Sequence, residues 1–458
     1  MKKTILILLF GLLSNMTFAQ NKLSKDTPKT NTYPSLLQLC KELRLLERTS
    51  LPSGVPDYRS QTILKIQQTL LQYKARHANI DTIGWSTEQR IDYVLLLAEM
   101  NAVDYNCRIL KPWVRDPAFY AIIFNEQSDT PEHEGPTSFA AIELWKYSYP
   151  LSTEAETQLT AQLKIIPPLY EQAKINLTGN AKDLWNAGIG NVKDQIMMLD
   201  ELEKKTTNNS TALKNAIAKS KEAILKQKEI LPVKNYMEPE LRKNIGEFIP
   251  EDKRNFFANI SFRAPAILYS HSTHWFEIAR LREEPHTSLL RKEALPYNMW
   301  MQRSEGLATS MEETLMHAGL WDANPRAREL VWIMLAQRCA RGLASLYAQA
   351  NMINYEQARK FQVEWTPKGW TGDESLVGFE QHLYLRQPGY GTSYVTGKYF
   401  IEKLMMDMGR LQQNNFTFYN FFDTFYNAGI IPVTLVGWQM TGNDGEIKDL
   451  LKNYLKFK

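Results

Sequence analysis

The chain has 458 residues, of which 44% are hydrophobic and 23% charged, a composition typical of a globular protein with an extensive buried core. Its formal net charge is +4, and the charges are spread without a basic block, which disfavours nucleic acid and membrane surfaces as partners. The three cysteines, Cys40, Cys107 and Cys339, are too few for a disulfide framework.

Residues 1–20 have the features of a secretory signal. Lys2 and Lys3 precede an apolar run from Ile5 to Leu13, and small residues follow around Ala19. The apolar run is too short to act as a permanent membrane anchor. The sequence therefore predicts an exported protein, periplasmic or secreted, with no membrane span, and residues 21–32 are expected to form a polar leader.

Helical patterns dominate the remaining sequence. Ser86 and Gln89 fit a capping box, and apolar residues then recur at intervals of three and four from Ile91 to Ile109. Further amphipathic helices are predicted at 60–76, 153–175, 180–204 and 211–230, the last two joined as a hairpin by the polar turn 206–211. We expect a mainly α fold, one domain over 33–458, with an N-terminal helical part to about 234 and a cleft-forming part from about 235.

The segment 256–319 is rich in residues that can bind metals. It holds several glutamates and four of the seven histidines, His271, His274, His286 and His317. A zinc site needs about three such ligands at tetrahedral geometry. The helical HExxH pair is absent, and the one His-Glu dipeptide, His133-Glu134, stands in a Pro/Gly-bearing loop with no second histidine.

The spacing of His271, His274 and Glu277 would place all three on one helical face. A stripe of salt bridges more often produces such a pattern than a metal site does. Arg280 lies close enough to pair with Glu277 or with Glu283, so local ion pairs are the expected arrangement.

The helical stretch 303–320 carries Glu305 and Glu312 two turns apart, so both carboxylates project from nearly the same face. Periodicity does not determine whether that face is turned inward. His317 follows Glu313 by one turn, and we expect these two to pair.

The glycine-containing segment 384–400 does not match a phosphate-binding loop, because its glycines are misplaced and Tyr399 stands where Ser or Thr should bind magnesium. Ser393 lacks the following glycine of a nucleophile elbow. We interpret the segment as a glycine-assisted loop running into a helix, with Tyr384, Tyr390 and Tyr394 lining a cleft.

Several motifs together resemble the bacterial domain-of-unknown-function family 885. EGLATSME at 305–312 is similar to that family's EGWALYAE helix, and YLRQPGYGTSYVTGK at 384–398 to its Y…PGxALSYxxGK segment. The similarity extends over most of the mature chain through RIDYVLLLAEM (90–100), KPWVRDPAFY (111–120), IIPPLYEQAKINL (165–177) and FYNAGIIPVTLVGWQM (425–440).

The resemblance implies a gluzincin-like, neurolysin-like scaffold, a mostly helical body enclosing a deep cleft. In that family zinc is held by two histidines of HExxPGH and by the glutamate that opens EGWALYAE, which Glu305 matches. This chain has no HExxPGH. If His274 is laid on the first histidine, Trp275 replaces the general-base glutamate and Arg280 the second ligand.

A further pair of family positions also differs. Where the family has an Asp and a His after its paired arginines, counting from Arg338 and Arg341 gives Ser345 and Gln349. Trp275 cannot accept a proton, and the guanidinium of an arginine repels a dication and does not deprotonate. An ordinary zinc-peptidase mechanism is therefore disfavoured.

Two hypotheses of different classes follow. In the first, the protein binds a peptide or another charged small molecule without hydrolysis, through Arg280, Arg282, Glu305, Glu312, Arg338, Arg341 and the tyrosines. Each of these charged residues except Glu305 is expected, taken singly, to form a buried ion pair between helices. In the second, a metal-dependent peptidase or other hydrolase, with zinc as the candidate metal and Glu312 or Glu313 as base, uses a displaced site drawn from His271, His274, His286 and Glu305.

Overall fold

The computed structural model describes residues 32–125, 139–179, 181–230, 265–292, 301–366 and 374–456. The predicted signal sequence, nearly all of its leader and His133-Glu134 lie outside these ranges. Within them the fold is mainly helical, as predicted, and the strands are limited to a parallel pair, β1 (Ile123–Phe124) and β2 (Ile142–Glu143). No helix in the described ranges has the length and apolar character needed to cross a membrane.

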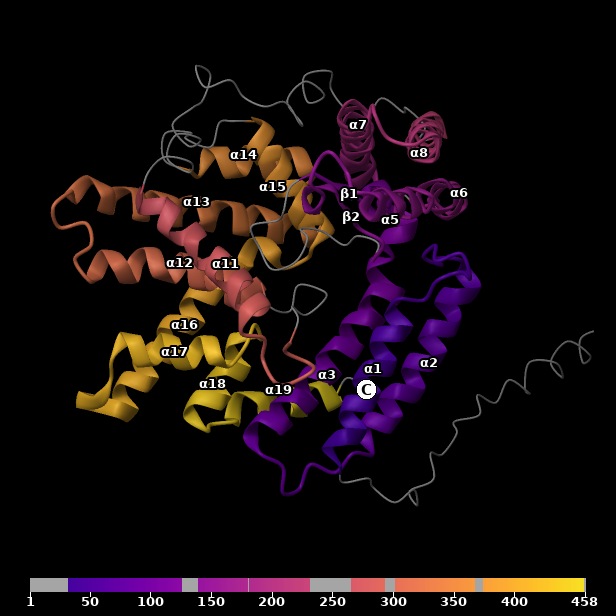
Figure 1. Cartoon of the computed structure of the whole chain (residues 1–458). Helices are drawn as coiled ribbons and strands as arrows, with labels where there is room; N and C mark the ends of the chain where they lie inside the picture. The colour runs from indigo at the N-terminus through magenta and orange to yellow at the C-terminus, as the bar shows by residue number, and fades with distance from the viewer. Residues whose placement is uncertain are drawn as a thin grey trace, which may run out of the picture.

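The N-terminal part begins with three helices that pack on one another, α1 (Tyr33–Glu47), α2 (Ser60–Ala78) and α3 (Thr87–Tyr105) (Figure 1). The predicted capping box is confirmed, since the Ser86 hydroxyl accepts the Gln89 N–H and the Gln89 side chain accepts the Ser86 N–H. The chain continues from α3 as a π-helix, η1 (Asn106–Leu110), so the long predicted helix is present with its last turn widened. Two short helices, α4 (Pro112–Arg115) and η2 (Pro117–Tyr120), then lead to β1.

A second group of helices follows β2 and the short η3 (Leu144–Lys146). These are α5 (Thr153–Leu163), α6 (Ile166–Asn176), α7 (Lys182–Lys205) and α8 (Thr211–Ile230). The stretch predicted as one helix over 153–175 is two, because Pro167 and Pro168 lack the N–H groups that would continue α5 and instead fit the first turn of α6. The hairpin predicted across 206–211 is confirmed by the packing of α7 against α8 (Figure 1).

The C-terminal part is built around α12 and α16, with α11 and α13 packed against them. Its described elements are α11 (Pro265–Glu283), α12 (Met301–His317), α13 (Pro325–Gln349), α14 (Tyr355–Glu364), α15 (Glu374–Arg386), α16 (Tyr390–Gln412), η6 (Gln413–Asn415), α17 (Phe418–Asn427), α18 (Val433–Thr441) and α19 (Gly445–Lys456). Figure 1 shows α11 running across α12 on the face turned toward the viewer.

Glycines set how closely the central helices approach. A Cβ atom on Gly397 of α16 would overlap the Gln302 carbonyl oxygen and Gly306 of α12, and a Cβ on Gly306 would overlap Gly397. At the other end of α16, a Cβ on Gly391 would overlap Ser345 of α13. The prediction of a glycine-assisted loop running into a helix holds for residues 387–389, where Gly389 has a φ of 89°. It is corrected on either side, because α15 extends to Arg386, α16 already begins at Tyr390, and Gly391 and Gly397 are packing positions inside α16.

A buried ion pair joins the N-terminal and C-terminal parts. Arg291 Nε donates to Asp92 Oδ1 of α3 over 2.7 Å, and the two side chains are 0% and 2% exposed. The same guanidinium donates to the Ala428 carbonyl oxygen at 3.1 Å and to Gln439 Oε1 at 2.6 Å. Arg291 thereby ties α3 to the segment that connects α17 with α18.

Candidate functional site

Glu305 of α12 contacts two other buried side chains, each from a different helix. His274 Nε2 of α11 lies 3.4 Å from Glu305 Oε2, and the Tyr390 hydroxyl of α16 donates to Glu305 Oε1 at 2.5 Å. Glu305 and His274 are each 5% exposed and Tyr390 is 1% exposed. Glu305 is therefore turned into the protein, the orientation that the resemblance implied and periodicity left open.

The predicted tyrosines continue this cluster. The Tyr390 ring lies between Tyr384 and Tyr394, with 5.8 Å between ring centroids on either side. Tyr384 is 1% exposed and belongs to the hydrophobic core, whereas Tyr394 is half-buried and packs against that core. The three rings thus form a packed aromatic row beside Glu305.

The buried guanidinium of Arg341 interacts electrostatically with Glu305. Arg341 of α13 forms an ion pair with Glu380 of α15, and its guanidinium lies 3.9 Å from the centroid of the Tyr394 ring. Burial lowers the pKa of Arg341, but the neighbouring Tyr384, Glu380, Tyr394 and Glu305 together raise it well above its usual value. Arg341 consequently keeps its positive charge at this site.

Glu312 and Glu313 are both engaged with cations. Arg338 of α13 binds Glu312 through two bonds of 2.5 and 2.8 Å, and both side chains are buried. Glu313 lies 2.7 Å from Lys398 Nζ and pairs with His317 at 3.3 Å, as predicted for these two. The interhelical ion pairs expected of Glu312, Arg338 and Arg341 are therefore present.

Glu277 reaches across to the neighbouring helix. It forms an ion pair with Arg303 of α12, and each of the two side chains is 1% exposed. Burial lowers the pKa of Arg303 to about 10, and its guanidinium lies 4.7 Å from the Phe425 ring centroid. The prediction that Glu277 pairs with Arg280 is wrong. Glu277 faces α12, whereas Arg280, in the last turn of α11, contacts Glu284 and Asn427.

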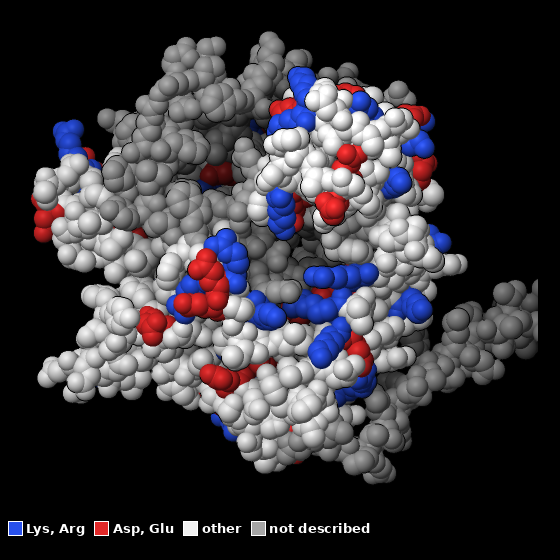
Figure 2. Space-filling model, viewed as in Figure 1, with Lys and Arg blue, Asp and Glu red and all other residues white. Residues whose placement is uncertain are grey.

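A cavity of about 320 Å³ opens beside this ion pair. The Arg, Glu and His residues that line it come from α11, α12 and the segment after α11, and they are Glu277, Arg280, Glu284, His286, Arg291 and Arg303. Arg280 donates to Asn427 Oδ1 at 2.7 Å and lies 3.3 Å from Glu284. Glu283 pairs with Arg282 instead of Arg280. Figure 2 shows Lys and Arg side chains gathered across the middle of this face, near the end of α11.

The candidate metal ligands are only partly brought together. His274 and Glu305 meet, whereas His286 lines the cavity, where its Nδ1 accepts the Ser288 N–H at 2.9 Å and burial lowers its pKa. The side chain of His271 is outside the described part of the protein. Among described residues no three His, Cys, Asp or Glu side chains gather closely enough to hold a metal ion. With two donors and the cation of Arg341 nearby, the described residues do not fit zinc.

Ser345 and Gln349, at the positions where the family that the motifs resemble has an Asp and a His, form hydrogen bonds to backbone carbonyl oxygens. The Ser345 hydroxyl donates to the Gly342 carbonyl oxygen at 2.8 Å, and its side chain faces Gly391. The Gln349 amide donates to the carbonyl oxygens of Tyr384 and Leu385, at 2.8 and 3.2 Å. The two Gln349 bonds hold the end of α15 against α13, whereas the Ser345 bond lies within α13.

The comparisons with known proteins define a fold. No family model matches the chain, and no curated protein sequence matches it. A candidate lipoprotein of unknown function from Shewanella oneidensis is similar in structure, with a TM-score of 0.55 at 12% identity over 89% of this chain and 97% of that chain. A candidate lipoprotein from Colwellia psychrerythraea gives a TM-score of 0.55 at 12% identity over 90% of this chain and 98% of that one. The resemblance to family 885 stays a prediction from the motifs.

Proposed function

We propose that this is an exported helical protein that binds a peptide or another charged small molecule at the cavity beside Arg280, without hydrolysing it. The observation that carries the proposal is a cavity of about 320 Å³ whose lining includes a rim arginine with an exchangeable partner. Cavities of this size that offer a few convergent polar groups are typical of small-molecule sites.

Arg280 is the lining cation best placed to bind a ligand. Arg291 and Arg303 are committed to the buried carboxylates of Asp92 and Glu277. Arg280 instead contacts Glu284, whose side chain is 70% exposed, and such surface ion pairs are weak. A ligand carboxylate can replace Glu284 and form the two parallel bonds that a guanidinium favours.

The aromatic rings beside Arg280 fit the same role. Its guanidinium lies 5.9 Å from the Phe276 ring centroid and 5.6 Å from that of Tyr426. Stacking on aromatic rings limits the orientations that an arginine side chain adopts, so less freedom is lost when it binds a carboxylate. The Asn427 amide holds the guanidinium from a third direction.

The engaged carboxylates of α12 support binding without hydrolysis. A metal-dependent hydrolase needs a carboxylate that can take a proton from the attacking water. Glu312 and Glu313 are held by Arg338 and Lys398, and Glu305 accepts a hydrogen bond from Tyr390. An inward glutamate in the EGLATSME helix supports a metallopeptidase-like scaffold with a degenerate metal motif.

Export is the third element of the proposal. Residues 1–20 carry the signal-like pattern of charged, apolar and small residues. The similar structures from Shewanella oneidensis and Colwellia psychrerythraea are described as candidate lipoproteins, which accords with export.

Trialanine and its C-terminal amide test the role of Arg280, because the two ligands differ at the terminal carboxylate. Titration calorimetry is expected to show tighter binding of trialanine, and Arg280→Ala is expected to weaken it about tenfold while leaving the amide unchanged. Arg282→Ala is the matched control, since Arg282 is 71% exposed and pairs with Glu283. Equal affinity for the two ligands, or no loss in Arg280→Ala, would contradict the proposed site.

The contact between His274 and Glu305 favours a second candidate function, metal-dependent hydrolysis. Chromatography of trialanine incubated with the protein is expected to show no cleavage, either with added zinc or with a chelator. Cleavage that stops on chelation and in Glu305→Gln would replace the proposed function by this one. A metal analysis of protein purified without chelators, with His274→Ala as the comparison, identifies the ion in that case.

A further inference from the structure

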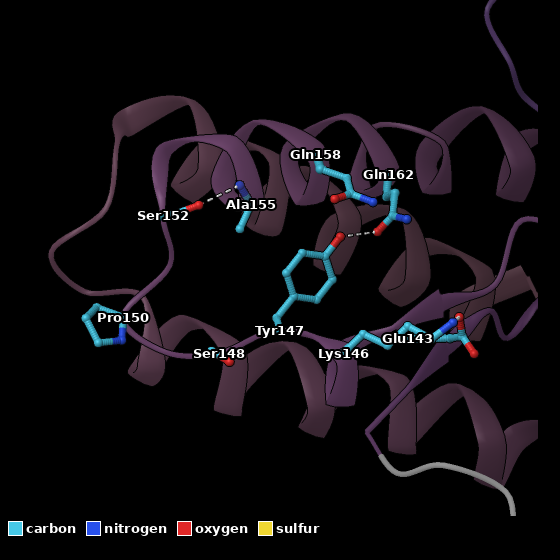
Figure 3. A pocket seen from close by; sticks show the side chains of 9 residues that line it. All are labelled: Glu143, Lys146, Tyr147, Ser148, Pro150, Ser152, Ala155, Gln158 and Gln162. Atoms are coloured by element: carbon cyan, nitrogen blue, oxygen red, sulfur yellow. Dashed lines mark hydrogen bonds and ion pairs between the residues drawn. The ribbon is translucent and has the colours of Figure 1, made fainter. Parts of the chain in front are cut away.

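A second cavity, of about 480 Å³, lies on a different part of the molecule, between α5 and the segment 143–150. It shares no lining residue with the cavity beside Arg280. Figure 3 shows its side chains arranged on two walls, one from α5 and one from the segment that follows β2. The polar residues that line it are Glu143, Lys146, Tyr147, Ser148, Ser152, Gln158 and Gln162.

The α5 wall presents uncharged polar groups in a row. Ser152 caps α5, with its hydroxyl accepting the Ala155 N–H at 3.2 Å. Ala155, Gln158 and Gln162 follow at spacings of three and four residues, so they lie on one face of the helix. Two side-chain amides, each with donors and an acceptor, therefore border the cavity.

The opposite wall fixes one of these amides. The Tyr147 hydroxyl donates to Gln162 Oε1 at 2.8 Å (Figure 3). Burial raises the pKa of Tyr147, so its hydroxyl keeps its proton and remains the donor. Tyr147 occupies one lone pair of the Gln162 amide oxygen and so fixes the orientation of the amide, whose NH₂ group supplies two donors for an acceptor on a ligand.

The charged residues of this cavity cancel. Glu143 and Lys146 form an ion pair with each other, and Lys146 also lies 5.0 Å from the Trp145 ring centroid. The lining therefore has no net charge with which to select an anion or a cation. An aromatic ring flanked by amides and hydroxyls instead matches a ligand that has an apolar face and many hydroxyl groups.

We propose that this cavity binds a neutral polyhydroxylated small molecule, with a mono- or disaccharide as the ligand class. The amides of Gln158 and Gln162 and the Ser148 hydroxyl bond the ligand hydroxyls, and the Tyr147 ring packs against its C–H groups. The cavity volume of about 480 Å³ lies within the range that small-molecule sites occupy. This site is independent of the cavity beside Arg280.

The test is titration of the full-length mature protein with glucose, N-acetylglucosamine, maltose and lactose, using calorimetry and saturation-transfer NMR. At least one of these sugars is expected to bind, and Gln158→Ala and Gln162→Ala are each expected to weaken it about tenfold, because each removes hydrogen bonds to the ligand. Gln68→Ala is the control, since Gln68 is exposed on α2 and outside the cavity.

A second variant keeps the test independent of any disturbance to α5. Ser148→Trp places a bulky ring into the cavity from an exposed position, and it is expected to abolish sugar binding while leaving trialanine binding and the melting temperature unchanged. Absence of binding by all four sugars, tighter binding of glucose 6-phosphate than of glucose, or unchanged affinity in Gln158→Ala would overturn the proposal.

Discussion

Replacing Gly397 by alanine is expected to lower the free energy of unfolding by about 3 kcal/mol, because overpacking at a tight contact costs about that much when the neighbour cannot move aside. The added Cβ would overlap the Gln302 carbonyl oxygen and Gly306, which are backbone positions of α12. Unlike a flexible side chain, a helix backbone can yield only by moving the whole helix. Urea denaturation followed by circular dichroism measures the change.

Gly409 supplies a matched control on the same helix. A Cβ at Gly409 meets no atom within 4 Å, so Gly409→Ala is expected to stabilise the protein by up to about 1 kcal/mol through helix propensity. Gly306→Ala is expected to behave like Gly397→Ala, since the same crossing is affected from the other side. Similar urea midpoints of unfolding for Gly397→Ala and Gly409→Ala would contradict the prediction. They would show that the close contact between α12 and α16 does not contribute to stability.

Much of the local structure could be predicted from the sequence, because it depends on neighbours a few residues away. The capping box of Ser86 and Gln89 and the hairpin at 206–211 follow from local hydrogen bonding and turn composition. The division of α5 from α6 could also have been found, since Pro167 and Pro168 mark a new first turn.

The partners inside the candidate site could not be predicted in the same way. Periodicity shows which residues share a helical face, but it does not show which other helix that face meets. Glu277 was expected to pair locally and instead meets Arg303 of α12, and Arg341 meets Glu380 of α15. Sequence reasoning did not single out Arg303 or Glu380, because each stands among other polar residues, in MQRSEG (301–306) and GFEQHL (378–383), and so does not differ from a residue on a solvated face.

The glycines of segment 384–400 illustrate the same limit. Their spacing was tested against phosphate loops and nucleophile elbows, in which glycine permits unusual backbone angles. Gly391 and Gly397 lie inside α16, where a different property of glycine matters. Because they have no side chain, α12 and α13 can approach α16 closely. Gly389 alone uses conformational freedom in this segment, as the left-handed residue before α16, with φ of 89°.

Asp92→Ala is expected to lower the free energy of unfolding by about 3 to 5 kcal/mol, the usual cost of leaving a buried charge without its partner. Arg291 would remain fully buried with no carboxylate to accept from its Nε. The Tyr33 and Ser288 hydroxyls, which donate to Asp92 Oδ2 at 2.5 and 2.6 Å, would also lose their acceptor. Chemical denaturation followed by tryptophan fluorescence measures the loss.

A double variant separates the unpaired charge from the loss of packing. Asp92→Ala with Arg291→Met removes both charges, and it is expected to recover part of the lost stability, because an apolar pair of similar volume avoids the desolvation of two ions. Glu283→Ala is the control, because its pair with Arg282 is exposed on both sides, and it is expected to change stability by less than about 0.5 kcal/mol.

The Asp92 variant also tests whether residues 33–458 fold as one unit, which we propose because Asp92 and Arg291 join α1 and α3 to the segment between α17 and α18. If both parts unfold together, fluorescence and circular dichroism give coincident transitions in the wild type, and the whole transition shifts in Asp92→Ala. Two separate transitions in the wild type would show that the parts are independent. If Asp92→Ala shifts only one of two transitions, the hydrogen bonds of Asp92 with Tyr33, Ser288 and Arg291 stabilise only the part of the chain that unfolds in that transition.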